Sequence, residues 1–463
     1  MTAPAPQAPG RAPGTDTSDP GRSWWVRPGL GIEAGRLTIA GRDAEGLARE
    51  RGTPLFVYDR PRFAENAGRL IAALERAGLR HRLRFALKAN PDPAALEVLR
   101  PLVEIDACSP GEVIRALDCG WPAAEISYTG TNVSERDLDV LLETGVHLNL
   151  DAISQIERVG RRIAADGRTP QPIGIRLNPG AGAGYHPGLA YSGERPTKFG
   201  IYEDRLAEAT AVAARHGLPI DTVHVHAGSG WLADGLVDYE AVLGRVAAIA
   251  RRLIADGHPI AEVNVGGGIG VPARTEERAV DVDAYAAAIA GQMGDLGVAI
   301  GCEPGDYIAK DAAILLGEVV TVEDRGGTTF IGLDMGWNVN CSYFIYRYAQ
   351  EFVLCRAADA ARTERVTVAG HINEAGDVFA RGLPDGGRSR GRHRRPAQCG
   401  RLPRGDELDP LPPAPRGVRL SRSLTAGEAW VSPATGRPSC ERDGSSAGSA
   451  GDAGGPGRGI ART

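Results

Sequence analysis

Eight short apolar runs, each ending in polar or glycine residues, alternate with alanine- and leucine-rich amphipathic stretches between about residues 53 and 304 of this 463-residue chain. Such alternation predicts βαβ units and a parallel sheet. Eight units in roughly 250 residues favour a (β/α)8 barrel over a doubly wound sheet, which would not need eight strands. The expected strands cover residues 83–87, 103–107, 126–129, 146–150, 172–177, 222–227, 263–265 and 298–302.

Polar side chains follow several of these runs. Active sites of such barrels gather at the carboxyl ends of the strands, and phosphate often binds after the seventh and eighth. The residues in these positions are Lys88 after the first run, His224, His226 and Ser229 at the sixth, Gly266–Gly268 after the seventh and Glu303–Gly305 after the eighth. The sequence therefore predicts one site built from four strands.

Lys88 ends an apolar segment, and desolvation there would favour its neutral, nucleophilic amine. Schiff-base formation with a carbonyl cofactor is the natural use of such an amine, and a lysine that merely extends from a strand end into solvent is the alternative. The chain has only two other lysines. We interpret Lys198 as structural or substrate-proximal and Lys310 as exposed.

The glycine run and the glutamate point to a phosphorylated, cationic ring. Gly266–Gly268 allow close backbone approach, and their N–H groups can hold a phosphate, with a tight turn as the alternative. Glu303 beside a phosphate calls for a cation such as a protonated pyridine nitrogen, with a solvated carboxylate as the alternative. His224 and His226 share one strand face, but no third ligand lies nearby, so we expect no metal. Together with Lys88, these groups indicate pyridoxal 5′-phosphate.

Six motifs, in order along the chain, carry a resemblance to a known family. They are Phe85–Asn90, Ser109–Glu112, Thr197–Ile201, His226–Ser229, Gly266–Gly268 and Glu303–Gly305. The segment from about residue 52 to residue 377 resembles the fold-type III pyridoxal-phosphate decarboxylases, the ornithine/diaminopimelate/arginine group. Within that group it is most similar to diaminopimelate decarboxylase.

The resemblance implies an amino-acid decarboxylase, a carboxy-lyase in which Lys88 carries the cofactor as a Schiff base and CO2 is released. His226 would stack on the cofactor ring and Glu303 would hold its nitrogen. The resemblance also implies a homodimer whose shared active sites are completed by the segment that carries Asn373 and Glu374. The cofactor-binding residues that it implies are Lys88, His226, Ser229, Gly266, Gly267, Gly268, Glu303 and Gly305.

Three positions depart from the family's pattern. Asp306 follows Glu303–Gly305 where the family has an arginine, and Ser342 stands where diaminopimelate decarboxylases have an arginine that binds the substrate carboxylate. Asn373 stands where the family has a proton-donating cysteine, although Glu374 is retained. We therefore expect the distal end of the substrate to be neutral, cationic or carrier-bound, as in a siderophore or another specialised-metabolite intermediate.

Two other functions stay open. An amino-acid racemase of the alanine-racemase type uses the same cofactor, but such enzymes place an arginine at the ring nitrogen, where this chain offers Glu303. A cofactor-binding, inactive homologue is the second alternative, motivated by Asn373 and by the composition of the C-terminal segment.

Composition changes near residue 381. The last 83 residues hold 16 Gly, 10 Pro and 15 Arg and lack Lys, Tyr and Phe, which is typical of disorder and of out-of-frame translation of GC-rich DNA. The expected fold is therefore α/β, a TIM-like barrel followed by a truncated all-β domain and a disordered tail. The expected parts are a disordered leader (1–30), a segment that contributes to the β domain (31–52), the pyridoxal-phosphate barrel (53–310), the partial β domain (311–380) and a low-complexity tail that a frameshift would explain (381–463).

Location and partners follow from features that the sequence lacks. No run approaches the ~20 apolar residues that span a membrane, and residues 1–22 have no apolar core of a signal peptide. The seven cysteines form no CxxC pair, so we expect no disulfide framework and a reducing cytoplasm. The arginines of the tail lack the stacking aromatics of a nucleic-acid-binding segment. We expect a cytoplasmic enzyme for a small amino acid, with no nucleic-acid or membrane partner.

Overall fold

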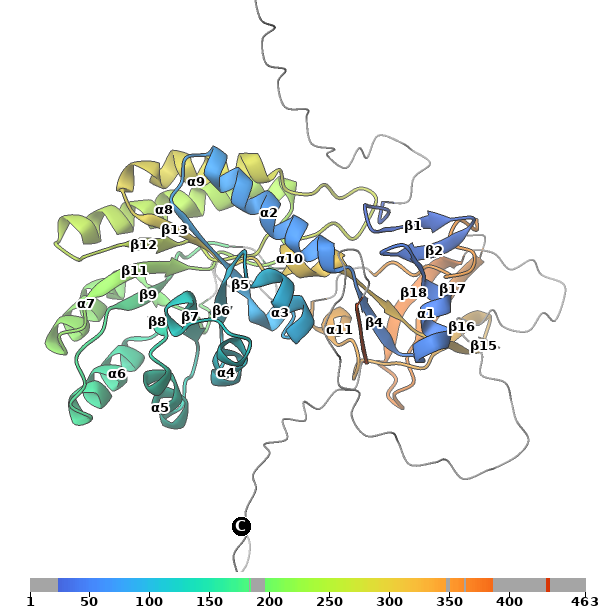
Figure 1. The fold of residues 1–463 in the computed structure, drawn as a ribbon, viewed down its shortest axis with the longest axis horizontal. Helices are drawn as coiled ribbons and strands as arrows, with labels where there is room; N and C mark the ends of the chain where they lie inside the picture. The colour runs from blue at the N-terminus through green and yellow to red at the C-terminus, as the bar shows by residue number, and fades with distance from the viewer. Residues whose placement is uncertain are drawn as a thin grey trace, which may run out of the picture.

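The computed structural model describes residues 24–182, 184, 196–346, 350–361, 364–385 and 430–433. Within these ranges, Figure 1 shows a helix-wrapped barrel next to a smaller region rich in strands. Among the described helices, none is both long and apolar enough to cross a lipid bilayer.

Eight parallel strands close into the barrel, because β13 pairs with β5 and β8 pairs with β9. In order around the barrel they are β5 (His81–Ala86), β6 (Glu104–Ala107), β7 (Ile126–Gly130), β8 (His147–Leu150), β9 (Ile173–Asn178), β11 (Ile220–Val225), β12 (Glu262–Asn264) and β13 (Ala299–Cys302). A two-residue strand, β10 (Ile201–Tyr202), lies beside β9. Each barrel strand overlaps one of the eight predicted runs, so the predicted barrel is confirmed.

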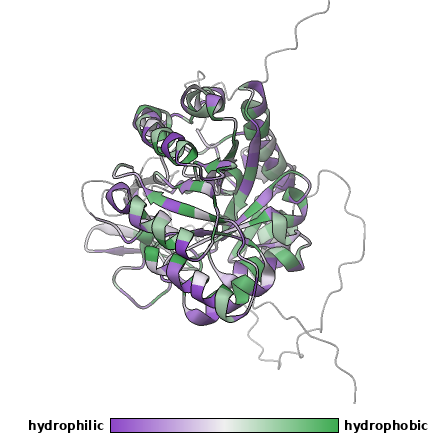
Figure 2. Cartoon of the chain, turned by 90° about the vertical axis from the view of Figure 1, so that its left-hand side faces the viewer, coloured by the Kyte–Doolittle hydropathy of each residue, from purple (hydrophilic) through white to green (hydrophobic). Residues whose placement is uncertain are grey.

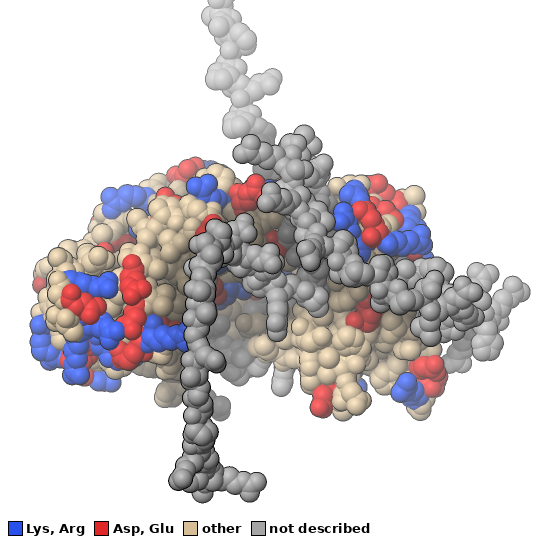
Figure 3. Space-filling view, turned by 60° about the horizontal axis from the view of Figure 1, so that its bottom comes forward, with Lys and Arg blue, Asp and Glu red and all other residues tan. Residues whose placement is uncertain are grey.

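Amphipathic helices surround these strands. They are α2 (Arg60–Arg76), α3 (Pro93–Leu99), α4 (Pro110–Asp118), α5 (Glu135–Thr144), α6 (Ile153–Ala165), α7 (Leu206–Arg215), α8 (Leu236–Ala255) and α9 (Val282–Met293). Side chains cap the N-termini of several of these helices. Ser134 before α5 and Asp281 before α9 accept hydrogen bonds from backbone N–H groups of the first turn. Viewed towards the barrel, the helices form a ring with hydrophilic residues prominent on its outside (Figure 2). Acidic and basic side chains intermingle on this outer surface (Figure 3).

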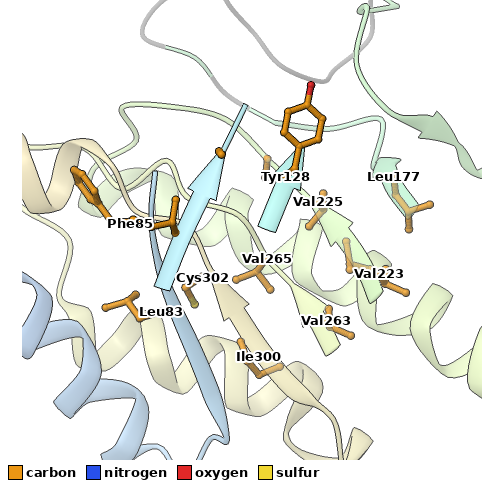
Figure 4. Packing of buried hydrophobic residues seen from close by; sticks show 14 of the residues in the cluster. Leu83, Phe85, Tyr128, Leu177, Val223, Val225, Val263, Val265, Ile300 and Cys302 are labelled. Atoms are coloured by element: carbon orange, nitrogen blue, oxygen red, sulfur yellow. The ribbon is translucent and has the colours of Figure 1, made fainter. Parts of the chain in front are cut away.

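Apolar side chains from neighbouring strands fill the space around the barrel wall. Leu83 and Phe85 of β5, Val223 of β11, Val263 of β12 and Ile300 of β13 are all at most 4% exposed and lie close together in Figure 4. Burying one such side chain stabilises the fold by about 1.5–3 kcal/mol. The packed wall fixes the strands, and hence the polar residues at their carboxyl ends.

The second region consists mainly of strands, which confirms the predicted all-β domain after the barrel. Its largest sheet has the order β15 (Val319–Arg325), β16 (Thr328–Leu333), β17 (Glu364–Ala369) and β18 (Val378–Asp385). A second sheet contains β1 (Leu30–Glu33), β2 (Arg36–Ile39) and β3 (Arg42–Asp43), and a third places β4 (Leu55–Tyr58) between β14 (Ala313–Leu316) and β19 (Trp430–Pro433). Short helices complete the fold: α1 (Ala44–Arg51), α10 (Asp306–Ala309) and α11 (Ser342–Tyr346).

The N-terminal segment packs onto this second region. Trp25 and Leu37 are buried in one cluster with Leu316 and Cys355, and the N–H of Leu37 donates to the carbonyl of Cys355 at 2.7 Å. Packed structure therefore begins before residue 30, where we expected the leader to end. The rest of the expected leader (1–23), and the expected tail apart from residues 381–385 and 430–433, lie outside the described residues.

Candidate active site

Glu303 follows β13 and is only 7% exposed. Its Oε2 accepts a hydrogen bond from His224 Nε2 at 3.0 Å, and its Oε1 accepts one from Asn264 Nδ2 at 2.7 Å. Burial alone would raise the pKa of this carboxyl, but His224, Arg84 and Asn264 together lower the pKa to about 2. Glu303 is therefore a buried anion held by two donors.

Lys88 lies in a single 3₁₀ turn, Leu87–Ala89, directly after β5. Burial raises the pKa of Asp106 to about 8, and Lys88 is among the charges that oppose this rise. The ammonium of Lys88 therefore lies near the carboxyl ends of the strands. The expected desolvation of Lys88 by the apolar strand is wrong, because the residue is exposed.

His226 is held between two partners just after β11. Its Nδ1 accepts a hydrogen bond from the N–H of Gly267 at 3.4 Å, and its Nε2 lies 3.2 Å from Ser229 Oγ. Burial, and after it the charges of Lys88 and Arg176, lower the pKa of His226 well below its ordinary value. The imidazole is therefore neutral near pH 7, which suits an aromatic ring that stacks on a cofactor.

The glycine loop after β12 leaves no room for side chains. Gly266 and Gly268 have φ angles of 72° and 109°, in the region that favours glycine. A Cβ on Gly267 would collide with the carbonyl of Glu303. Within the described part of the chain, the N–H groups of Ser229 and Gly268 have no acceptor. Such groups are suited to bind a phosphate.

Gly305 links this loop to the Lys88 turn. It precedes α10, and a Cβ placed on it would press against Ala89. Upstream, the carbonyl of Pro304 accepts a hydrogen bond from the N–H of Ala86 at 3.3 Å. The structure thus brings the ends of β5, β11, β12 and β13 together, as the sequence predicted. An amine, a buried anion for a ring nitrogen and a phosphate loop are the groups that pyridoxal phosphate requires, so the residues fit it.

Three polar residues at this end of the barrel, Asn264, Asp106 and Arg176, were missed as parts of the site, because they lie within apolar runs. Asn264 contacts Glu303, as does the predicted His224. Asp106 is 5% exposed, and its Oδ1 has no partner among the described residues. Arg176 lies 4.7 Å above the ring of Phe199. The sequence feature that could have identified them is the presence of a polar residue inside an otherwise apolar strand.

Asn373 and Glu374 lie elsewhere, in the turn between β17 and β18. Both are exposed. The N–H of Glu374 donates to the carbonyl of Ile372 at 2.7 Å, and the carbonyl of Glu374 accepts from Asp377 at 3.0 Å. None of the contacts found among the described residues joins this turn to the Lys88 turn of the same chain.

A cavity of about 710 Å³ separates the barrel from the β-rich region. Asn90 and Pro91, just after Lys88, form part of its wall, as do Asp306 and Ser342. Lys310 also lines it, so the expectation of an exposed lysine is corrected. Burial lowers the pKa of Lys310, and the negative charges of Asp306 and Glu277 oppose that change.

Known proteins resemble this chain in both sequence and structure. Residues 65–310 match the family described as "Pyridoxal-dependent decarboxylase, pyridoxal binding domain". The diaminopimelate decarboxylase of Methanothermobacter thermautotrophicus is 35% identical over 365 residues, which cover 75% of this chain and 82% of the relative. That of Streptomyces coelicolor is 31% identical over 346 residues, which cover 72% and 74%.

Solved structures agree with these sequence matches. The diaminopimelate decarboxylase of M. jannaschii in co-complex with L-lysine superposes with a TM-score of 0.69 at 26% identity, covering 76% of this chain and 83% of that one. The Helicobacter pylori enzyme complexed with L-lysine gives a TM-score of 0.66 at 26% identity, covering 73% and 84%. This chain therefore belongs to the family of pyridoxal-phosphate-dependent decarboxylases, and it is a carboxy-lyase similar to diaminopimelate decarboxylase.

Proposed function

We propose that this enzyme removes the α-carboxyl group of an amino acid as CO2 at the site formed by Lys88, His226, Ser229, the glycine loop and Glu303. The observation that carries the proposal is the state of Glu303. Two hydrogen bonds hold this carboxylate, and its pKa lies near 2 despite burial. A fixed anion is suited to keep a proton on the ring nitrogen of pyridoxal phosphate.

Each residue would have one task. When bound, pyridoxal phosphate supplies an electron sink for the pair of electrons left by the departing carboxyl group. Lys88 would hold the cofactor through its amine, and the substrate amine would displace it. Neutral His226 would support the ring face, while Ser229 and the glycine loop, through the N–H of Gly268, would bind the phosphate. Orientation of the departing carboxylate against the ring plane is a positioning effect.

The charge of Glu303 also bears on the two alternative functions. A racemase of the alanine-racemase type would need a cation at the ring nitrogen, and Glu303 is an anion. An inactive homologue has no support from this part of the site, since the lysine, the anion and the phosphate loop are all present. Decarboxylation is therefore the function we propose.

The proposal extends to the substrate, which we take to be a specialised-metabolite or siderophore intermediate with a neutral, cationic or carrier-bound distal end. Asp306 and Ser342 line the cavity next to Lys88. Lys310 lines it too, but Asp306 precedes it by one helical turn and acts on its charge. The cavity thus offers little net positive charge for a distal carboxylate.

Release of CO2 from a panel of amino acids tests these points. Meso-diaminopimelate, ornithine, arginine and lysine would be compared, with Lys88→Ala as the control. Efficient turnover of meso-diaminopimelate would overturn the substrate proposal only. If the native protein neither releases CO2 nor gains a visible absorption band with pyridoxal phosphate, the proposed function is wrong.

We further propose a cytoplasmic homodimer in which the turn carrying Asn373 and Glu374 completes the site of the other copy. Support comes from the exposure of both residues and of Ile345, which is 48% exposed. All five described cysteines are free, which fits a reducing compartment. Mixing Lys88→Ala with Glu374→Gln tests the sharing, because mixed dimers would recover one intact site. Absence of recovered activity in proven mixed dimers would contradict it.

We also propose that the boundaries given above describe the domains, apart from the end of the leader, which lies before Trp25, and that a change of reading frame near codon 381 produced the tail. Its composition supports this, with 16 Gly, 10 Pro and no Tyr among 83 residues. Strand β18 continues to Asp385, so the change would fall within or after this strand. Resequencing tests the idea, and a confirmed frame with no Tyr-containing β domain in either neighbouring frame would refute it.

A further inference from the structure

His224 is a buried polar side chain that has no task in the proposed removal of CO2. It lies on β11, two residues before His226, and is 1% exposed. Its Nε2 is 3.0 Å from Glu303 Oε2. Its Nδ1 is buried and has no hydrogen-bond partner within the described residues. Because an unpartnered buried polar atom costs free energy, a histidine here calls for an explanation.

We propose that His224 is a positioning residue, which holds the carboxylate of Glu303 as an oriented anion facing the ring nitrogen of the cofactor. The inference rests on the proposed role of Glu303. His224 and Asn264 each donate to a different oxygen of the carboxylate. Both oxygens keep a second lone pair, so the carboxylate is fixed and can still accept from a protonated ring nitrogen.

The chemistry of the contact fixes which group donates. A carboxylate only accepts hydrogen bonds, so the Nε2 of His224 carries a proton and donates to Oε2 of Glu303. A hydrogen bond to an ionised acceptor is stronger than one between neutral groups, so this contact is suited to fix the orientation of the carboxylate.

Other groups around Glu303 cannot replace this contact. Asn264 also accepts a hydrogen bond from the N–H of Gly266 at 2.9 Å, so it links the carboxylate to the glycine loop. Arg84 acts on Glu303 through its charge alone, and its guanidinium is bound to Glu262. Only His224 donates to Oε2 among the described residues. Loss of this donor would free one side of the carboxylate.

The test compares two cofactors, pyridoxal 5′-phosphate and its 1-deaza analogue, in which a C–H group replaces the ring nitrogen. Dissociation constants of both would be measured by absorbance titration for the native protein and for His224→Leu, His224→Gln and His224→Asn. The Gln amide can reach the Nε2 position and donate to Glu303, whereas the Asn amide reaches only the Nδ1 position. A matched control is His147→Leu, since His147 makes a similar contact, 2.8 Å to Asp221, at the other end of the barrel.

We expect His224→Leu and His224→Asn to raise the dissociation constant of pyridoxal phosphate roughly tenfold to a hundredfold, the range for losing a hydrogen bond to a charged group. Binding of the deaza analogue should change less than about twofold. His224→Gln should restore most of the affinity, and His147→Leu should change neither dissociation constant. If His224 had a purely structural role, its replacement would instead weaken the binding of both cofactors equally.

Equal weakening of both cofactors, or no weakening of either, overturns the inference. If His224→Leu does not fold, as judged by circular dichroism, the comparison of Gln with Asn still decides. Glu303→Gln separates this inference from the proposed function. If Glu303→Gln does not discriminate between the cofactors, the proposed role of Glu303 fails. If Glu303→Gln weakens the binding of pyridoxal phosphate more than that of the deaza analogue and His224→Asn weakens both equally, only the inference about His224 fails.

Discussion

A buried ion pair inside the barrel gives the sharpest stability prediction. Arg84 of β5 and Glu262 of β12 contact each other through both guanidinium Nη atoms, one of them at 2.9 Å. Their side chains are 4% and 7% exposed. Replacing Glu262 by Gln keeps the size of the side chain but leaves a buried cation. Its remaining acidic neighbours are Glu104, 3.2 Å away, and Glu303, which acts on it through its charge alone.

The expected loss in the free energy of unfolding is about 3 kcal/mol, the lower end of the range for breaking a buried pair, because Glu104 compensates in part. A matched control is Asp283→Asn, which breaks the pair between Asp283 and Arg76. That pair joins α9 to α2 at 2.6 Å, but its side chains are 60% and 59% exposed. Its loss should cost at most about 1 kcal/mol.

Urea unfolding of both variants measures the difference, provided that circular dichroism and tryptophan fluorescence give coincident transitions. The double change Arg84→Met with Glu262→Met should be less destabilising than Glu262→Gln, because no unpaired charge remains. If Glu262→Gln costs no more than Asp283→Asn, burial does not control the strength of these pairs and the reasoning is refuted.

Three further predictions concern the site. The pKa of Asp106, about 8 in the folded chain, exceeds that of an unfolded aspartate, so stability should fall as pH rises from about 4 to about 8. Asp106→Asn should flatten the fall in a pH series of urea midpoints, and an unchanged slope would contradict this. Gly267→Ala should weaken the binding of pyridoxal phosphate at least about tenfold, because its Cβ would displace the carbonyl of Glu303. An affinity equal to that of the native protein in a titration would refute the tight packing of this loop. Lys310→Ala should leave Asp306 uncompensated and lower KM for ornithine relative to a neutral amino acid, whereas an unaltered KM ratio would show that Lys310 does not face the substrate.

The barrel could be predicted because its strands are buried on both faces and therefore form continuous apolar runs. The glycine loop and Glu303 were found for a related reason, since both directly follow such runs. The pairing of Arg84 with Glu262 could not be predicted, because the two residues are 178 positions apart. The sequence pattern also did not indicate that β4 pairs with β14, because the residues of a short apolar strand do not determine which other strand it pairs with.

Contacts with distant segments also explain the errors about single residues. Lys310 was expected to be exposed because it lies in a run that leads into the β domain, but it lines a cavity formed with segments such as Pro272 and Ser342. Trp25 was assigned to the leader because its neighbours are rich in proline and glycine, yet it packs with Leu316. In both cases a contact made across the fold decided the burial.

The polar residues inside the barrel form one connected electrostatic arrangement. Glu262 binds Arg84, and the charge of Arg84 helps to lower the pKa of Glu303. A buried pair rarely adds stability over well-packed apolar side chains, so stability alone does not account for Arg84. Its charge instead helps to keep Glu303 ionised, where burial would otherwise favour the neutral acid. Arg84→Met should therefore raise the pKa of Glu303 and weaken the binding of pyridoxal phosphate more than the binding of its 1-deaza analogue. Equal weakening of the binding of both cofactors would show that the pair serves packing alone.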